Sequence, residues 1–337
     1  DIEGIARAVS GWVHTSRSAR EVAADAARAV QAARQQPHMV ATLVLPADVA
    51  WGEAARSAPP LPVAVAAPVD DAAVAAAETL LRNGRRTSIL LGGVALTADG
   101  LAAAGRIAAA TGARLLCDTF TPRLARGAGR VPIERIPYFA EQMVDTLAGV
   151  EQLLLVHAKP PVAFFAYPDK PSLGLPADAV ATVLAHPHED GVGALVALAE
   201  ALGAHAPGPV AERRVDGSPA GALDQFGIGR IIAAHLPEGA IVSDEAATNS
   251  LGPQLALLTA APHDMLSLMG GSIGQGLPVA SGAAVACPDR KVVCLHGDGG
   301  AMYTLQSLWT QAREQLDVTT VIFANRRYSI LDIELGR

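Results

Sequence analysis

Residues 291–325 decide the fold, because a short apolar run stands at each end of this stretch. Residues 291–300 read Lys-Val-Val-Cys-Leu-His-Gly-Asp-Gly-Gly, and residues 318–325 read Val-Thr-Thr-Val-Ile-Phe-Ala-Asn. Residues 303–316 between them carry apolar side chains at helical spacing, namely Leu305, Leu308, Trp309, Ala312 and Leu316. A strand, a helix and a second strand in this order predict a β-α-β unit of a parallel sheet.

Polar residues follow both predicted strands. Asp298 comes directly after the first strand, and Asn325 follows the second. Because parallel strands end at a common edge, where such sheets bind ligands, we expect these two side chains to lie side by side. Carboxylate and amide oxygens are hard donors that suit Mg²⁺, whose other ligands are usually water and phosphate oxygens. Gly297, Gly299 and Gly300 would let the backbone approach a diphosphate closely.

The same alternation of helices and buried apolar runs extends over most of the chain. Further helices are predicted over residues 20–35, 71–83, 97–111, 138–148, 191–203 and 221–236, with another from about residue 273. Further strands are predicted over residues 41–45, 87–91, 114–117, 152–157 and 240–242. Apolar strands of this length between helices are typical of sheets that are covered on both faces. The sequence therefore predicts an α/β fold with doubly wound parallel sheets.

Two stretches rich in proline divide the chain. Residues 52–68 and 206–217 are predicted linkers. They separate three parts, residues 1–51, 69–205 and 218–337. The first part has one predicted helix and one predicted strand, which is too little for a domain, so we interpret it as the end of a sheet domain.

Composition and charge exclude several classes of protein. Half of the 337 residues are apolar and 18% are charged, which is the profile of a well-buried globular protein. A net charge of −7 argues against a nucleic-acid partner. No apolar run reaches the ~20 residues of a membrane-spanning helix, and no signal peptide is found. The three cysteines are widely separated and are expected to be reduced, so we predict a cytoplasmic protein with no membrane partner.

Gly297-Asp298-Gly299 together with Asn325 resembles the thiamin-diphosphate (ThDP) motif of the superfamily of acetolactate synthase, benzoylformate decarboxylase and pyruvate decarboxylase. The resemblance implies a ThDP and Mg²⁺ site with three metal ligands, Asp298, Asn325 and the backbone carbonyl of Arg327. It also implies that Tyr328 lies against the diphosphate. Members of the superfamily usually have two asparagines here, whereas this chain keeps only the second, which is the metal ligand.

A second segment, Gly270–Val279, resembles the glycine-rich part of the same superfamily. The resemblance implies that Ile273 wedges under ThDP and holds its two rings in a V, while the carbonyl of Gly271 accepts from the pyrimidine amino group. Residues 241–250 resemble the first strand and turn of the same domain, whose hydroxyl groups touch the diphosphate. Thr248 is the candidate there, and a polar helix cap is the alternative role.

The resemblance covers nearly the whole chain. It implies that residues 1–51 are the C-terminal part of the pyrimidine-binding (PYR) domain, residues 69–205 the central domain, and residues 218–337 an incomplete diphosphate-binding (PP) domain. The superfamily's catalytic glutamate lies early in the PYR domain. We therefore expect a fragment without this glutamate, whose catalytic residue is unknown. Because the cofactor sits between domains of two subunits, a homodimer or homotetramer is expected.

The implied function is a ThDP- and Mg²⁺-dependent lyase or carboligase that decarboxylates a 2-oxo acid, either acetolactate synthase-like or a decarboxylase. A non-catalytic partner subunit that keeps the fold for assembly is the alternative. A nicotinamide oxidoreductase is disfavoured, because no G-x-G-x-x-G pattern occurs. FAD at Gly92-Gly93 is possible but not favoured. His296 is expected either to face the cofactor or to be a hydrogen-bonded core residue.

Overall fold

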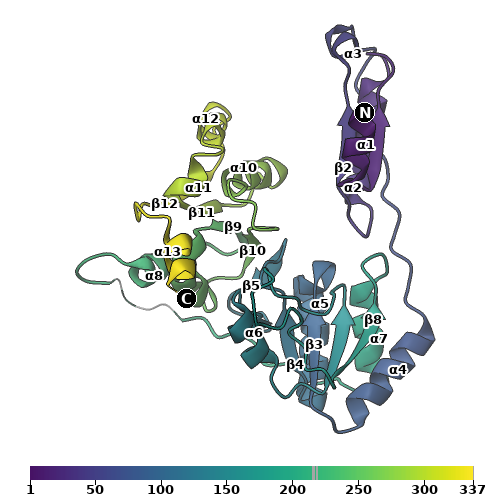
Figure 1. Cartoon of the computed structure of the whole chain (residues 1–337), viewed down its shortest axis with the longest axis vertical. Helices are drawn as coiled ribbons and strands as arrows, with labels where there is room; N and C mark the ends of the chain where they lie inside the picture. The colour runs from purple at the N-terminus through teal and green to yellow at the C-terminus, as the bar shows by residue number, and fades with distance from the viewer. Residues whose placement is uncertain (215–216, 218, 337) are drawn as a thin grey trace.

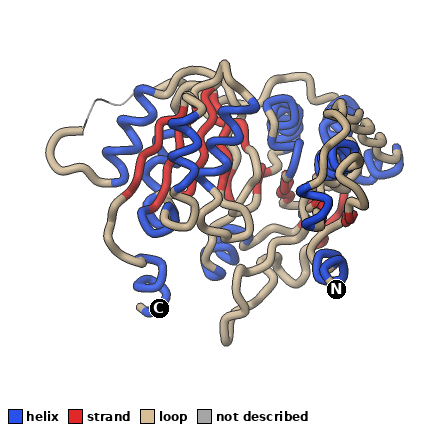
Figure 2. The backbone as a smooth tube through the Cα atoms, turned by 90° about the horizontal axis from the view of Figure 1, so that it is seen from above, coloured by secondary structure: helices blue, strands red, loops and turns tan. Residues whose placement is uncertain are grey.

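The computed structural model describes residues 1–214, 217 and 219–336, which form three units. A small N-terminal unit with a two-stranded sheet stands apart from two larger units, each built around a five-stranded sheet (Figure 1). In the larger units the strands lie between helices (Figure 2). The predicted α/β class, with parallel sheets covered on both faces, is confirmed.

The N-terminal unit contains three more elements than the sequence predicts. Its order is α1 (Ile2–Arg7), β1 (Trp12–Thr15), α2 (Val22–Arg34), β2 (Ala41–Val44) and α3 (Ala47–Trp51). The two strands pair in parallel. The buried carboxylate of Asp25 accepts from the hydroxyl of Ser16 at 2.7 Å and lies 3.3 Å from Nε2 of His14. These contacts hold α2 on β1. The additional helices and β1 are too short to give a periodic sequence pattern.

The central sheet has the strand order β6-β4-β3-β7-β8. Its unit contains α4 (Asp71–Arg82), β3 (Thr87–Leu91), η1 (Gly93–Leu96), α5 (Ala98–Thr111), β4 (Arg114–Cys117), β6 (Glu134–Arg135), α6 (Ala140–Leu147), β7 (Gln152–Val156), β8 (Val180–Ala185) and α7 (Gly191–Ala201). Successive residues of β3 enter opposite cores: Ile89 and Leu91 pack on the side of α4, α5 and α7, whereas Leu90 packs on the side of α6. Burial on both faces explains why this strand is an unbroken apolar run.

The C-terminal sheet has the strand order β12-β11-β9-β10-β5. Its unit contains α8 (Gln225–His235), β9 (Ala240–Glu245), η2 (Ala247–Asn249), α9 (Leu251–Leu257), β10 (His263–Ser267), α10 (Gly276–Ala286), β11 (Val292–Gly297), α11 (Asp298–Ala301), α12 (Gln306–Arg313), β12 (Val318–Phe323) and α13 (Ser329–Leu335). Val242 and Leu295 pack on one face with the core of α8 and α9. Ile241 and Cys294 pack on the other face with α10. This sheet is therefore also covered on both sides.

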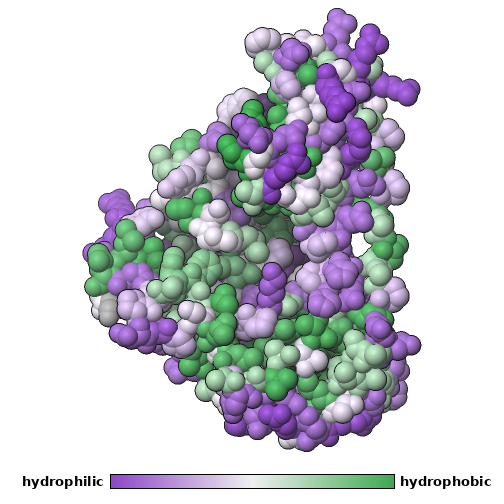
Figure 3. Space-filling model, turned by 45° about the vertical axis from the view of Figure 1, so that its right-hand side comes forward, coloured by the Kyte–Doolittle hydropathy of each residue, from purple (hydrophilic) through white to green (hydrophobic). Residues whose placement is uncertain are grey.

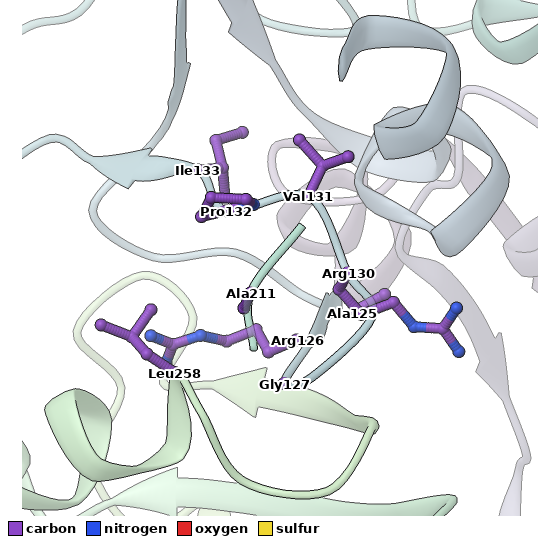
Figure 4. Close-up of a pocket in the computed structure, with 9 residues that line it drawn as sticks. All are labelled: Ala125, Arg126, Gly127, Arg130, Val131, Pro132, Ile133, Ala211 and Leu258. Carbon is purple, nitrogen blue, oxygen red and sulfur yellow. The ribbon is translucent and has the colours of Figure 1, made fainter. Parts of the chain in front are cut away.

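One strand of the C-terminal sheet comes from residues 69–205. This strand, β5 (Leu124–Arg126), pairs antiparallel with β10. Beside it, the carboxylate of Asp264 accepts from Arg123 at 3.0 Å and from Arg290 at 2.8 Å. Arg126 extends toward Leu258 and Arg130 points the opposite way, around a cavity of about 10 Å³ (Figure 4). That volume suits a single water molecule, so this seam joins the two large units but is too small for an organic ligand.

The helix predicted over residues 303–316 is wrong in its bounds and in its buried face. Within this range the structure has only the shorter α12 (Gln306–Arg313), and the separate short helix α11 precedes it. Four of the five apolar residues expected on one face are exposed, Leu305, Leu308, Trp309 and Ala312. Gln311 of α12 is buried instead and donates to Oγ of Ser281 on α10 at 3.0 Å. Side-chain hydrogen bonding therefore fixes the inner face of α12, and the apolar face is turned outward.

Two other sequence expectations concern linkers and thiols. Residues 53–66 contain no helix or strand, and of the second predicted linker, 206–217, residues 215 and 216 lie outside the described residues. Cys117 and Cys294 are buried free thiols, and burial raises the pKa of each to about 12. They are therefore protonated core residues, as expected. No helix in the described part of the chain is long and apolar enough to cross a membrane.

Helices α8 and α9 cross at two glycines, and this crossing gives a stability prediction. A Cβ on Gly229 would lie 2.7 Å from the carbonyl carbon and oxygen of Gly252. Because backbone atoms cannot yield as a flexible side chain can, Gly229→Ala is expected to lower the free energy of unfolding by about 1–3 kcal/mol. Gly282→Ala is the matched control, since a Cβ there meets nothing within 4 Å on the exposed side of α10. Urea unfolding of both variants measures the difference, and equal midpoints would contradict the prediction.

Candidate functional site

Polar residues gather at the carboxyl edge of the C-terminal sheet. Strands β9, β11 and β12 run parallel and end at this edge, before Thr248, Asp298 and Asn325 respectively. Oδ2 of Asp298 accepts from the backbone N–H of Arg326 at 3.1 Å, and its Oδ1 accepts from the N–H of Gly299 at 3.0 Å. The carboxylate after β11 therefore lies against the turn that follows β12, as the β-α-β geometry requires.

The turn at residues 325–328 is held in a defined shape. Oδ1 of Asn325 accepts from the N–H of Arg327 at 3.0 Å, and its Nδ2 donates to Oγ of Ser329 at 3.1 Å. Arg326 has a φ of 55°, a left-handed conformation that is costly for a residue with a side chain. Tyr328 precedes α13 and is exposed. Costly backbone conformations are common at functional sites, so this turn marks the edge as a candidate site.

The three glycines around Asp298 have different surroundings. A Cβ on Gly299 would meet nothing within 4 Å, and one on Gly297 would meet only the carbonyl oxygen of Glu245, at 3.8 Å. A ligand can therefore approach the backbone closely at these two positions. A Cβ on Gly300 would lie 2.8 Å from Oε1 of Glu245. Gly300 is thus required for close packing within the edge.

The glycine-rich segment lies between β10 and α10. Gly271 is exposed with a φ of 68°, and its carbonyl accepts from the N–H of Ile273 at 3.1 Å. A carbonyl oxygen has two lone pairs, so a second donor can still bind there. Ile273 is half-buried, which leaves part of its side chain open to contact. Thr248 is also half-buried and lies in η2 beside Ala247, which has a φ of 53°.

Sequence reasoning misses the residue that joins these segments, Glu245 at the end of β9. Its buried carboxylate accepts from the N–H groups of Gly274 and Gly276, the latter at 2.6 Å. Nε2 of the fully buried His296 lies 3.2 Å from the same carboxylate. Burial works to raise the pKa of Glu245, but the hydrogen bonds from His296 and from the two N–H groups outweigh it and hold this pKa below its ordinary value.

Glu245 therefore fixes the glycine-rich segment to the edge that carries Asp298. The only signal in the sequence is that the predicted strand runs into two successive carboxylates, Asp244 and Glu245, because a buried charge needs partners. Its partners are 29 and 31 residues away in the glycine-rich segment and cannot be read from local spacing. His296 is fully buried and its Nδ1 lies 3.0 Å from the carbonyl oxygen of Gly297, which corresponds to the second of its two expected roles, a hydrogen-bonded core residue.

The donor atoms at this edge are oxygens of different kinds. Among the residues that the structure describes, no group of three or more His, Cys, Asp or Glu side chains is placed to hold a metal ion. Asp298 and Asn325 supply a carboxylate and an amide, and the backbone of the turn supplies carbonyl groups. A set with a single carboxylate leaves room for phosphate oxygens as further ligands of a hard cation.

The crevice of the central sheet is filled by His157. Strand order reverses between β3 and β7, where sheets of this kind bind nucleotides. A Cβ on Gly93 would lie 3.2 Å from Nδ1 of His157, and one on Gly191 would lie 2.6 Å from its Nε2. The same Nε2 is 2.9 Å from the carbonyl oxygen of Glu189. The glycine turn at residues 92–93 thus packs against an imidazole, and FAD binding there gains no support.

Comparison with known proteins matches residues 252–334 to the family described as thiamine pyrophosphate enzyme, C-terminal TPP binding domain. A Mycobacterium tuberculosis protein, named provisionally as the acetolactate synthase large subunit IlvX, is 49% identical over 340 residues. That alignment covers 100% of this chain and 65% of the relative, so the chain spans less than two thirds of the relative's length.

Two solved structures share the fold. The thiamine diphosphate-dependent 4-hydroxybenzoylformate decarboxylase of Rhodococcus jostii RHA1 has a TM-score of 0.74 at 22% identity, covering 100% of this chain and 68% of that one. The benzoylformate decarboxylase of Polynucleobacter necessarius has a TM-score of 0.71 at 19% identity, covering 97% of this chain and 65% of that one. At these identities the likeness shows the fold alone.

Proposed function

Because the chain belongs to the superfamily of thiamin-diphosphate-dependent enzymes, we propose that it binds ThDP with Mg²⁺ at the carboxyl edge of the C-terminal sheet. We further propose that the whole protein decarboxylates a 2-oxo acid, with or without carboligation. The observation that carries the proposal is the contact between the Asp298 carboxylate and the turn after β12. That contact brings a hard anionic donor beside an amide and a backbone in a costly conformation.

The oxygen donors at this edge fit Mg²⁺ that is shared with a diphosphate. Asp298, the amide oxygen of Asn325 and the carbonyl of Arg327 would be the protein ligands. The single carboxylate leaves positions for phosphate oxygens. Two exposed guanidinium groups, those of Arg326 and Arg327, stand where they can attract an anion.

Other residues of the edge would hold the rest of the cofactor. The open backbone at Gly297 and Gly299 allows close approach of the diphosphate, and Gly300 keeps the edge compact. Thr248 and the exposed Tyr328 would flank the diphosphate. When bound, ThDP would supply a nucleophilic carbon and an electron sink for the decarboxylation of a 2-oxo acid. Ile273 and the carbonyl of Gly271 would orient the rings of the cofactor; Glu245 holds this segment in place.

We propose the following domain assignment. Residues 1–51 would be the C-terminal part of a PYR domain, residues 69–205 a central domain, and residues 218–337 a PP domain. The parallel pairing of β1 with β2 and the separate position of their unit support the first assignment (Figure 1). The contact of β5 with β10 indicates that the second and third parts are joined by more than a linker.

Exposed apolar residues support the proposed homodimer or homotetramer. Helix α12 and the turn before it expose five large apolar side chains, Met302, Tyr303, Leu305, Leu308 and Trp309. The N-terminal unit exposes seven more, Ile2, Ile5, Val9, Val30, Val40, Leu45 and Trp51. Figure 3 shows a hollow between this unit and the larger units, with apolar residues around it. Clusters of exposed apolar side chains are typical of surfaces that contact other proteins.

Calorimetric titration of ThDP into the protein tests the proposed function. We expect saturable binding in the presence of Mg²⁺ and its loss when EDTA removes the metal. The absence of ThDP binding with Mg²⁺ present would overturn the proposal. Release of CO₂ from pyruvate, benzoylformate or oxalyl-CoA by the complete protein then tests turnover. Cofactor binding without release from any of them would favour the non-catalytic partner instead.

A further inference from the structure

A cavity of about 420 Å³ opens beside the glycine-rich segment, and the proposed cofactor chemistry does not use it. Its walls come from the loops after β4, β6 and β7 of the central sheet and from the end of the C-terminal segment at residues 269–270. Its volume lies within the ~300–1,000 Å³ that is usual for small-molecule sites. The two large units therefore share one pocket, distinct from the small cavity at the β5 seam.

Three aromatic rings line this pocket and contact one another. The centroids of Phe164 and Tyr138 are 5.1 Å apart, those of Phe164 and Phe120 are 5.4 Å apart, and those of Phe120 and Tyr138 are 6.3 Å apart. These separations lie in the range in which aromatic rings attract each other. The rings come from three loops that are distant in sequence, so together they form a preorganised aromatic wall.

Phe164 brings this wall to the proposed cofactor site. Its Cε1 atom lies 3.3 Å from the position that a Cβ on Gly271 would occupy. Gly271 bears the carbonyl that we assign to the pyrimidine amino group. A group bound to the reacting carbon of a substrate at this site can therefore extend along Gly270 into the aromatic pocket.

The chemistry of the pocket matches an uncharged aromatic group. Apart from the aromatic rings, most of its lining is aliphatic, as with Ile136 and Met143, both of which are buried. The two charged lining residues, Asp118 and Lys159, have opposite signs. Together they add no net charge to the pocket that would repel an anionic substrate. A methyl group would leave most of the volume unfilled, whereas an aryl group would remove apolar wall from water.

We propose that Phe120, Tyr138 and Phe164 form the side-chain pocket for the substrate, and that they select 2-oxo acids with an aryl side chain over pyruvate. This inference rests on the proposed function, because the pocket needs a cofactor at Gly271 to act on its occupant. Phe164 has the largest effect on this selection, since it contacts both the other two rings and the glycine-rich segment.

Binding of two unreactive analogues tests the inference on the whole chain loaded with ThDP and Mg²⁺. Benzoylphosphonate and acetylphosphonate carry a phosphonate in place of the carboxylate, so neither can lose CO₂. Calorimetry is expected to show at least about tenfold tighter binding of the benzoyl analogue, because its ring buries more apolar surface. Phe164→Ala is expected to reduce this preference about tenfold, because the contact between the aromatic rings is lost. The affinity for the acetyl analogue should stay within about twofold of the unmodified protein.

Phe165→Ala is the matched control. Phe165 is the next ring in the same loop and contacts Phe164, with centroids 5.8 Å apart, but it does not line the pocket. The inference requires that this variant keep the preference for the benzoyl analogue. Equal loss in both variants, or no preference in the unmodified protein, would overturn it. If Phe164→Ala does not fold, Phe164→Leu keeps the apolar bulk and removes the ring.

Titration of ThDP alone separates the two proposals. If ThDP binds but the analogues show no preference, the aromatic pocket is not the selector and the proposed function stands. If ThDP does not bind, the proposed function fails, and the substrate role of the pocket fails with it, whatever the analogues do. Retained ThDP affinity in Phe164→Ala shows that any change in preference comes from the pocket.

Discussion

Replacing Asp298 by alanine is expected to weaken Mg²⁺-dependent ThDP binding by more than about 100-fold. Mutation of residues that only support metal ligands already lowers metal affinity by about 10–100-fold, and Asp298 is proposed as a ligand itself. Asp298 is the single carboxylate in the proposed donor set, and its Oδ2 also accepts from the backbone of the turn that carries Asn325. The substitution therefore removes an anionic donor and releases the second donor from its position. Calorimetric titration of ThDP at fixed Mg²⁺ measures the loss.

The control for this prediction is Asp289→Ala. Asp289 is exposed and precedes β11, at the opposite end of that strand from Asp298. Both variants change the net charge equally, so a general electrostatic effect would appear in both. Unchanged ThDP affinity in Asp298→Ala would refute the metal-ligand assignment. Equal weakening in both variants would show that the site responds to net charge rather than to this ligand.

Glu245→Gln is expected to lower the free energy of unfolding by about 3 kcal/mol, the upper end of the usual cost of leaving a buried hydrogen-bond donor without its acceptor. The amide keeps the size of the side chain but has no charge. It also has only one oxygen, so the N–H of either Gly274 or Gly276 would face an NH₂ group, which cannot accept a hydrogen bond. ThDP affinity should fall as well, because the glycine-rich segment loses its anchor to the edge. Urea unfolding and ThDP titration measure the two effects.

The contribution of Glu245 to the free energy of unfolding should decrease as the pH is lowered. Its pKa is lowered in the folded protein, so the folded state favours the ionised carboxylate. The stabilisation is therefore complete above the ordinary glutamate pKa of about 4.3 and is lost as the pH falls through the lower folded value. The difference in unfolding free energy between the unmodified protein and Glu245→Gln should shrink on acidification from about pH 7 to about pH 3.

Glu238→Gln serves as the matched control for both effects, because Glu238 is exposed and lies just before β9. This variant should unfold like the unmodified protein at every pH tested. If Glu245→Gln has the same unfolding midpoint as Glu238→Gln, the carboxylate does not hold the edge together. A difference that grows on acidification would contradict the direction of the pKa shift.

The regular elements of the two large units follow well from local patterns. Strand β3 is predicted at the residues that the structure shows, 87–91, because burial on both faces makes it an unbroken apolar run between helices. Helix α4 begins at the predicted residue and ends one residue earlier than predicted. Strands such as β10, which includes His263 and Asp264, escape prediction because polar residues interrupt the apolar run, and Asp264 finds its partner elsewhere in the chain.

Sequence alone determines the β-α-β unit at residues 291–325 and the common edge of Asp298 and Asn325, because strand direction and strand ends are local properties. The tertiary structure alone decides that α12 turns its apolar face outward, that β5 joins the other sheet, and that Glu245 anchors the glycine-rich segment. It also brings Phe120, Tyr138 and Phe164 together. Each of these depends on contacts between residues distant in the chain, and a periodic pattern carries no information about which distant residue will be the partner.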